Sequence, residues 1–182
     1  MKTMNAAAAA LLTAAVALPA LAADKYHGCY TPLYGFAKSL CTDNETCSSQ
    51  TGLYRVVLRN EHAPIGKRKL VLSGMFQGLN VTPDPNHIAE CVAVSQTTHL
   101  LMDKNMAGTL ETGPDDVCLT GGGDMVNTIE VVERMAMSGG QGIYSNVIPG
   151  GTVTITGTIH RNTGINSFKV TPQPGDEVCF KS

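Results

Sequence analysis

The sequence predicts an all-β fold: a single antiparallel barrel of about eight strands, with a β-sandwich as the alternative. Short runs rich in Val, Ile, Leu and Thr recur along the chain, separated by Gly, Pro, Asn and Asp, and without helical periodicity. Glycine is frequent, with 19 residues in 182. The stretch 138–168 combines glycine pairs with a strict alternation of β-branched residues. These three observations are typical of an antiparallel sheet with tight corners.

Residues 1–22 are predicted to be a signal peptide. Lys2 supplies the positive charge, residues 6–18 the apolar region, and residues 20–22 (Ala-Leu-Ala) a cleavage site with small residues. The apolar run is shorter than the ~20 residues that a membrane-spanning helix needs. Because the segment is bacterial in type, we expect a periplasmic or secreted protein, cleaved near Ala22 and without a membrane span.

The six cysteines all follow this site, and an even number in an exported domain indicates disulfides. The favoured pairs are Cys41 with Cys47 across a polar turn, Cys91 with Cys118 between strands, and Cys29 with Cys179 at the two ends. A different pairing among Cys29, Cys41 and Cys47 is left open. Since all six are expected to be oxidised, a cysteine nucleophile is disfavoured.

We expect one domain after the signal peptide. Residues 23–50 are predicted to be an irregular, cysteine-containing segment, in which 34–40 is the only plausible helical turn. Residues 51–182 are predicted to form the barrel domain, and no Pro-rich or low-complexity linker divides them. The expected strands are 53–60, 69–76, 89–96, 99–103, 108–111, 117–120, 128–137, 151–161, 167–171 and 178–180. Turn signals such as Gly-Pro-Asp-Asp at 113–116 separate them.

The best-defined hairpin joins 151–161 to 167–171. One face of its first strand carries Val153, Ile155 and Ile159, and the opposite face carries Thr152, Thr154, Thr156 and Thr158. We therefore expect one buried face and one hydroxyl-rich face. Gly157 interrupts the apolar face, where a bulge or a bend would need a glycine.

Two neighbouring glycine motifs carry a resemblance to a known family. They are Met-Ala-Met-Ser-Gly-Gly-Gln-Gly-Ile-Tyr at 135–144 and Pro-Gly-Gly-Thr-Val-Thr-Ile-Thr-Gly at 149–157, with Met-Ala-Gly-Thr-Leu at 106–110 upstream. This pattern resembles the barrel family of allene oxide cyclase and dirigent proteins, over residues 100–171 at most. The resemblance implies an eight-stranded antiparallel barrel with a cavity. The cysteines and the N-terminal segment depart from that family, and none of its catalytic positions is matched, so the resemblance implies the fold and no activity.

Charge and motifs exclude several classes of function. The net charge is −2 and the Lys and Arg residues are scattered, which gives no electrostatic reason to bind nucleic acid or an anionic membrane. The one basic cluster, 66–69, is interpreted as a solvated turn. No G-x-S-x-G, H-E-x-x-H or P-loop motif is present. We therefore expect no cofactor, and the sequence favours a protein without catalytic activity.

Glu133 and Tyr54 are the candidate cavity residues. In the strand expected at 128–137, the odd positions read Ile129, Val131, Glu133, Met135 and Met137. A regular strand points Glu133 to the apolar side, where burial in a cavity would raise the pKa of its carboxyl group. A bulge at 131–132, the commoner arrangement, would turn it outward. Glu133 is the only catalytic candidate; Tyr54 lies on an apolar strand face, as a cavity aromatic or as core.

No metal site is predicted. The five histidines are His27, His62, His87, His99 and His160. None has a second imidazole or a carboxylate at ligand spacing, and each is expected at the surface or in a loop. Asp115, Asp116 and Asp124 form an oxygen-rich segment, but they lack the spacing of a calcium loop.

These observations support three hypotheses about function. The first is an exported, disulfide-stabilised barrel that binds a small apolar ligand or a protein partner without catalysis. The second is a cyclase-like barrel enzyme that uses a buried Glu133. The third is a structural or surface-assembly subunit, with the threonine-rich strand 152–158 as its interaction face.

Overall fold

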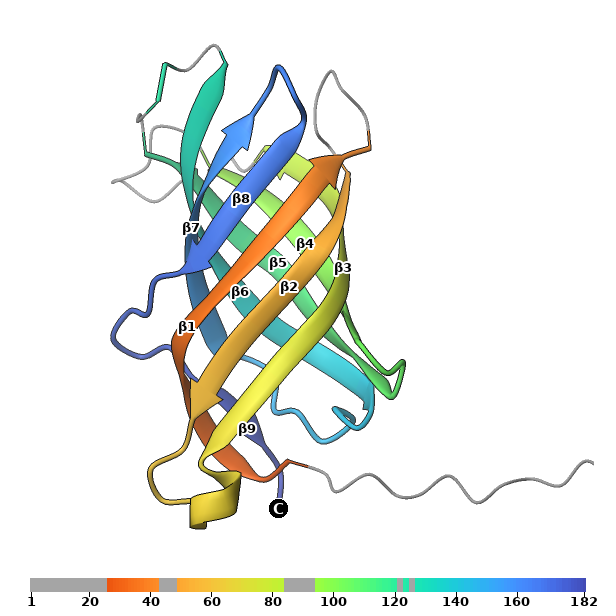
Figure 1. Cartoon of the computed structure of the whole chain (residues 1–182), viewed down its shortest axis with the longest axis vertical. Coiled ribbons are helices and arrows are strands. Elements are labelled where there is room, and N and C mark those ends of the chain that lie inside the picture. Colours follow the sequence, from red (N-terminus) through yellow and green to blue (C-terminus); the bar gives the residue numbers. More distant parts are fainter. Residues whose placement is uncertain (1–25, 43–48, 84–93, 121–122, 125–126) are drawn as a thin grey trace, which may run out of the picture.

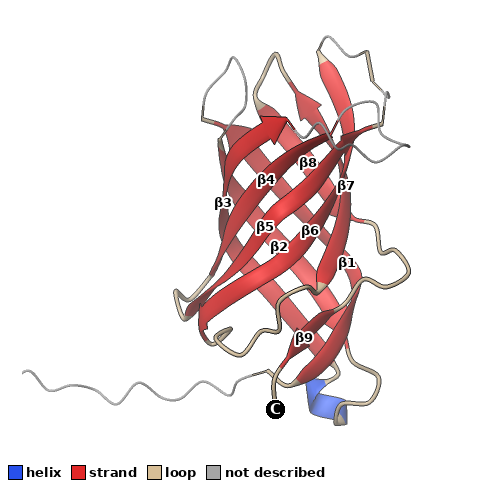
Figure 2. Cartoon of the chain, turned by 180° about the vertical axis from the view of Figure 1, so that it is seen from behind, coloured by secondary structure: helices blue, strands red, loops and turns tan. Residues whose placement is uncertain are grey.

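Nine strands and one short 3-10 helix make up the described part of the chain, which comprises residues 26–42, 49–83, 94–120, 123–124 and 127–182 of a computed structural model. The elements are β1 (Gly28–Cys41), β2 (Gln50–Arg59), η1 (Ile65–Lys67), β3 (Lys69–Pro83), β4 (Val94–Asp103), β5 (Gly108–Leu119), β6 (Thr128–Gly142), β7 (Thr152–His160), β8 (Ile165–Val170) and β9 (Val178–Phe180). Each of β1 to β7 pairs antiparallel with the next strand, and β8 pairs with β1, which closes the barrel. The predicted fold is confirmed as a closed eight-stranded antiparallel barrel with one extra strand (Figures 1 and 2).

The extra strand extends one wall of the barrel. The C-terminal part of β1 pairs with β8, whereas its first residues pair with β9, so that Cys29 lies opposite Cys179. The two cysteines form a disulfide, as one of the three favoured pairs predicts. Cys41 and Cys118 are also disulfide-bonded. Their predicted partners, Cys47 and Cys91, lie outside the described residues, as do the predicted signal peptide and residues 89–93 of a predicted strand.

The barrel interior is filled by alternate side chains of the strands. On β6, Ile129, Val131, Glu133, Met135 and Met137 are all buried. The pairing of β6 with β7 has no register shift, so the bulge expected at 131–132 does not form. Glu133 therefore points inward with its apolar neighbours, as the alternation of a regular strand requires.

The threonine face of β7 is partly covered. Thr152 and Thr154 are buried because the segment before β9 folds back over them. Their hydroxyl groups donate to Asp176 Oδ1 at 2.9 and 3.1 Å, and the Thr154 amide donates to Asp176 Oδ2 at 3.0 Å. Two of the four threonine hydroxyl groups on the expected interaction face, those of Thr152 and Thr154, therefore form hydrogen bonds inside the molecule.

Gly157 makes room for an aromatic ring. Neither the pairing with β6 nor that with β8 shifts register at this residue, so the expected bulge or bend is absent. A Cβ atom at position 157 would lie 2.2 Å from Cδ1 of Phe168 and 2.5 Å from the carbonyl oxygen of Ser167. The glycine therefore lets the buried Phe168 ring pack directly against the backbone of β7.

The segment predicted to be irregular, 23–50, contains β1, and the helical turn expected at 34–40 is wrong because these residues are extended. Two features make this strand difficult to recognise from the sequence. The pairing with β2 shifts register between Pro32 and Tyr34, which breaks the alternation. The outward side chains are also apolar, whereas those facing inward include the small Gly35 and Ala37. The barrel therefore begins at β1 rather than at residue 51.

The predicted turn at 113–116 lies within a single long strand, β5. The pairing of β5 with both neighbours is irregular here, and the Gly113–Pro114 peptide bond is cis. Gly113 has a φ of +115°, which favours glycine, and a Cβ atom there would lie 2.4 Å from Cγ2 of Thr98. The irregularity bends the strand without ending it, and it changes which side chains of β5 face the interior.

Among the described residues, no helix has the length and apolar character that crossing a membrane requires.

Candidate functional site

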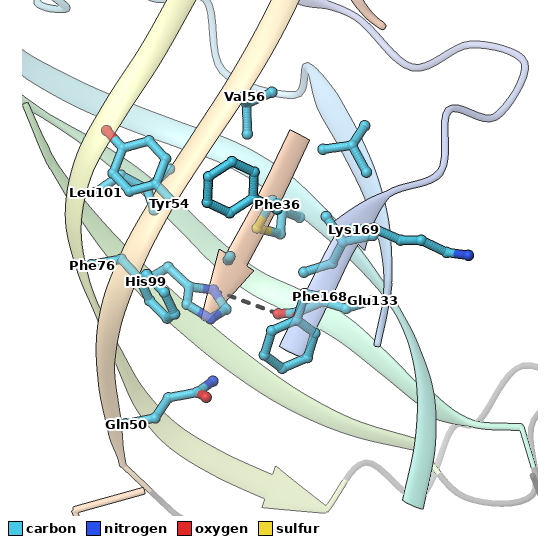
Figure 3. Close-up of a pocket in the computed structure, with 14 residues that line it drawn as sticks. Phe36, Gln50, Tyr54, Val56, Phe76, His99, Leu101, Glu133, Phe168 and Lys169 are labelled. Atoms are coloured by element: carbon cyan, nitrogen blue, oxygen red, sulfur yellow. Dashed lines mark ion pairs between the residues drawn. The ribbon is translucent and has the colours of Figure 1, made fainter. Parts of the chain in front are cut away.

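A small cavity lies inside the barrel, with about 40 Å³ of room for the centres of water molecules (Figure 3). Its lining is mainly apolar and includes Tyr54, Val56, Phe76, Leu101, Met135, Ile155, Phe168 and Val170. The buried ionisable side chains of His99 and Glu133 interrupt this lining, and the exposed Lys169 also borders it. Tyr54 and Glu133, the two cavity candidates from the sequence, therefore line the same cavity. His99 joins them although a surface position was expected.

Three adjacent strands bring the ionisable groups together. His99 comes from β4, Asp115 from β5 and Glu133 from β6, and all three side chains are buried. His99 and Glu133 face inward through the regular alternation of their strands. Asp115 faces inward because of the irregularity at 113–116, which places both Thr112 and Asp115 on the inner side of β5. The expected surface or loop position of His99 is therefore wrong, and strand pairing brings two carboxylates beside it that are not at ligand spacing in the sequence.

The hydrogen bonds of this cluster centre on Asp115. His99 Nδ1 lies 3.0 Å from Asp115 Oδ2, and because a carboxylate only accepts, Nδ1 donates. The Thr112 hydroxyl donates to the same oxygen, and the Ala136 amide donates to Asp115 Oδ1 at 2.7 Å. Asp115 is completely buried, and the sharing of its oxygens among three donors offsets the cost of burying its charge.

Glu133 is the least satisfied member of the cluster. Its Oε1 atom lies 3.5 Å from His99 Nδ1, and it is a buried atom without a hydrogen-bond donor in the described structure. Burial raises the pKa of Glu133 to about 7, against an opposing influence of the His99 charge and a reinforcing one of Asp115. A buried carboxylate oxygen that lacks a hydrogen bond beside a cavity can bind a cation or a ligand that donates a hydrogen bond.

His99 is held in a mixed environment. Its ring packs edge-on against Phe76, with the ring centres 5.8 Å apart. Burial lowers the pKa of His99, but the charge of Glu133 and the hydrogen bond and charge of Asp115 together raise it above its ordinary value. The two carboxylates therefore favour the protonated, cationic form of His99.

The cavity extends toward the surface along the seam between β1 and β8. Its lining includes the exposed Phe36 and Lys169, which face each other across these strands, together with the small Ala37. Figure 3 shows Phe36, Lys169, His99 and Glu133 around the same cavity, with a dashed line for the ion pair between His99 and Glu133.

Tyr54 lies farther along the cavity wall. Its hydroxyl donates to the carbonyl oxygen of Met102 at 3.4 Å, and burial, with the charges of Asp103 and Tyr26, raises its pKa. Tyr54 thus has a polar partner of its own and belongs to the wall rather than to the ionisable cluster.

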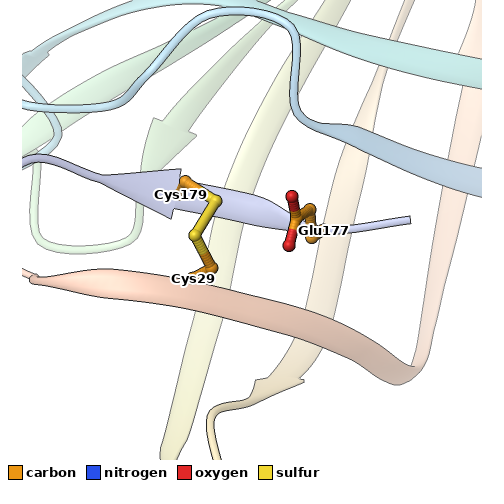
Figure 4. A group of neighbouring side chains, drawn as sticks. All are labelled: Cys29, Glu177 and Cys179. Atoms are coloured by element: carbon orange, nitrogen blue, oxygen red, sulfur yellow. A yellow bond between two sulfur atoms is a disulfide. The ribbon is translucent and has the colours of Figure 1, made fainter. Parts of the chain in front are cut away.

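A second group of potential ligands lies at the other end of β1. Cys29, Glu177 and Cys179 are close together, but both sulfur atoms are joined in the disulfide (Figure 4). A disulfide offers no thiolate, so only one carboxylate remains available there. The buried cluster of His99, Asp115 and Glu133 is the stronger of the two sites.

The outer surface of β8, β1, β2 and β3, here called the outer face, is unusually apolar. Large apolar side chains exposed there are Leu33, Tyr34, Phe36, Leu40, Leu53, Val71, Met75 and Ile165. They are neighbours across strands, since Leu40 pairs with Ile165 and Leu53 with Met75. These four strands contain no Asp or Glu, whereas exposed cations such as Lys38 and Arg55 stand among the apolar residues. The charged side chains on this face are therefore all basic.

The fold and the site together define a class of protein: a closed antiparallel barrel with a buried carboxylate–imidazole cluster beside a cavity. Comparison of the chain with protein-family models, with curated proteins and with solved structures finds no match.

Proposed function

We propose that this chain is an exported barrel that binds a small ligand in its interior, with Glu133 as the principal acceptor. The observation that carries the proposal is the buried Glu133 Oε1 atom, which faces the cavity without a donor in the described structure. Native proteins rarely leave such an atom unpaired, because the desolvation of a carboxylate is costly. The disulfide between Cys29 and Cys179 supports export, since disulfides persist in oxidising compartments.

The cavity narrows the class of ligand. About 40 Å³ of room holds a few water molecules, far less than the several hundred Å³ of a typical drug-sized site. The apolar walls suit an apolar ligand, but the inner end presents an acceptor and excess negative charge. The ligand that fits is therefore very small, and it carries a positive charge or hydrogen-bond donors toward Glu133.

Methylammonium is a suitable probe for this site. We expect it to shift the methyl NMR signals of Met135 and Ile155, which line the cavity, in a saturable way. With two heavy atoms, its Kd is expected in the millimolar range, given a ceiling of ~1.5 kcal/mol per atom. Formate, an anion of similar size, should leave these signals unchanged, and Glu133→Gln should abolish the response to methylammonium. Equal responses to both probes, or none, together with no adduct in the native mass spectrum of the exported protein, would refute the proposal.

A second observation favours a second function, the binding of a protein partner on the outer face. Contiguous exposed apolar patches mark interaction sites, and cations without nearby acidic side chains select the opposite charge. The partner that fits has an apolar contact surface with acidic residues around it. We therefore propose β8, β1, β2 and β3 as the interaction face, rather than the threonine face of β7.

The second function is tested by photo-crosslinking in the exporting cell. A crosslinking residue at Leu53 on β2 is compared with one at Glu130 on β6, an exposed position on the opposite wall. We expect position 53 alone to capture a defined protein through an acidic, apolar segment. Reversing the charges of Lys38 and Arg55 to Glu should lower the yield about tenfold. Capture of a second copy of this chain, of lipid alone, or of the same proteins from both positions would contradict it.

A further inference from the structure

We propose that His99, Asp115 and Glu133 together bind one divalent transition-metal ion inside the barrel, an inference that rests on the proposed function and names its ligand. One nitrogen and two carboxylate oxygens converge from three adjacent strands, and the three atoms all lie within 4.8 Å of one another. All three side chains are buried, so that their positions are set by the sheet and not by mobile surface rotamers.

The spacing of the donor atoms fits a metal ion. His99 Nδ1 is 3.0 Å from Asp115 Oδ2 and 3.5 Å from Glu133 Oε1. Ligands of a tetrahedral Zn²⁺ with bonds of about 2.1 Å lie about 3.4 Å apart, so an ion can enter between these atoms after small side-chain adjustments. The Glu133 oxygen, which lacks a hydrogen bond, would gain its missing partner.

The surroundings of Asp115 are those of an oriented metal ligand. The Thr112 hydroxyl donates to its Oδ2 atom and the Ala136 amide to its Oδ1 atom, so the carboxylate is fixed before any ion arrives. Metal-binding carboxylates are commonly held in this way by groups that do not touch the metal. Thr112 is therefore a positioning residue for the site.

Charge also favours a divalent ion. When both carboxylates are ionised, one divalent cation neutralises their two charges, and the imidazole binds in its neutral form after the proton on Nδ1 is released. A set of one imidazole and two carboxylates suits ions such as Zn²⁺ or Mn²⁺ better than thiolate-binding ions.

The cavity supplies the remaining coordination position. It borders both His99 and Glu133, and its volume of about 40 Å³ accommodates water as a further ligand. Its lining also includes Phe36 and Lys169, two exposed residues, so the cavity reaches toward the surface. Three protein ligands with one open position are the arrangement of zinc sites that also bind an exchangeable ligand.

Zinc binding to the full, exported protein tests the inference. The protein is dialysed against a chelator, returned to buffer and equilibrated with Zn²⁺, and the bound metal is measured by elemental analysis. We expect one ion per chain. Glu133→Gln and Asp115→Asn should each weaken binding at least ~100-fold, and Thr112→Val about 10- to 100-fold at unchanged stoichiometry. Glu130→Gln, on the exposed side of the same strand, is the matched control and should bind zinc like the wild type.

A second measurement covers variants that fail to fold. The X-ray absorption spectrum of zinc bound to the wild type should show a first shell of nitrogen and oxygen at ~2.1 Å without sulfur. Sulfur ligands, less than stoichiometric metal, or full zinc binding by Glu133→Gln and Asp115→Asn would overturn the inference. If zinc fails to bind but methylammonium binds at Glu133, the interior ligand site stands and only its identity as a metal site falls. If neither binds, both proposals fall.

Discussion

Replacing Cys29 and Cys179 together by serine is expected to lower the free energy of unfolding by about 4–5 kcal/mol. The two cysteines are 150 residues apart in the sequence, so their disulfide closes almost the whole described chain into one loop. The disulfide excludes many conformations of the unfolded chain. Without it, the unfolded state gains conformational entropy, and unfolding becomes more favourable. An effect of this size is a large part of the 5–15 kcal/mol that stabilises a typical domain.

Urea denaturation of the double variant against the wild type measures this effect. The double substitution is preferable to a reducing agent, which would also break the disulfides of Cys41 and Cys118. Serine differs from cysteine only in having an oxygen atom in place of the sulfur, so the pairing of β1 with β9 can remain. A change below about 1 kcal/mol would show that β9 holds the two ends together without the covalent bond.

The metal-free wild type is expected to lose about 3 kcal/mol of stability as the pH rises from about 4.5 to above 7, and Glu133→Gln is expected to lose much less. Burial raises the pKa of Glu133 from 4.5 to about 7 in the folded protein. Between these values the folded state binds more protons than the unfolded state, so stability falls as the pH rises. The contribution is complete below about 4.5 and is lost above the folded pKa.

The charges of His99 and Asp115, which face Glu133, both affect the pKa of its carboxyl group. The pKa of His99 is also raised in the folded state, so its contribution likewise falls as the pH rises through that value. Asp115 is held by three donors and stands beside His99. Because the charge of Glu133 is the largest influence that raises the pKa of His99, Glu133→Gln should also weaken the His99 contribution, and the variant should be more stable than the wild type at pH 8.

Urea denaturation at several pH values, with a chelator present, gives the measurement. Glu130→Gln is the control, because this exposed carboxylate lies three residues away on the outer side of β6. Wild-type stability that is constant or rises between pH 4.5 and 8 would contradict the raised pKa of Glu133. The same result would follow if the carboxylate were turned outward by a bulge, so this experiment also tests the strand geometry.

Local patterns were sufficient for most of the barrel. Alternating residues predict the hairpin of β7 and β8 and the long β6, because each strand has one apolar face that must be buried. The same reasoning fails for β1, where apolar side chains occupy the outer face and small ones the inner face. It also fails at 113–116, where Gly, Pro and Asp are typical of a turn but here form an irregularity within β5.

The site was visible from the sequence only in part. Glu133 stands out because it interrupts an apolar alternation, and Tyr54 because it shares an apolar face. His99 gives no such signal, since Leu100, Leu101 and Met102 make both faces of β4 apolar. Asp115 was assigned to a turn and considered only as a calcium ligand. Their meeting depends on the pairing of β4 with β5 and of β5 with β6, which joins residues far apart in the chain.

Periodicity, turn residues and cysteine number are local or compositional properties, and from them the sequence predicts the all-β class, the barrel as the favoured architecture and Cys29–Cys179 as one of the favoured disulfides. Only the tertiary structure decided that β1 belongs to the barrel, that Glu133 faces inward and that His99 and Asp115 lie beside it. The physical reason is that strand register and closure are set by packing between distant segments, and the chemistry of this molecule lies where three such segments meet.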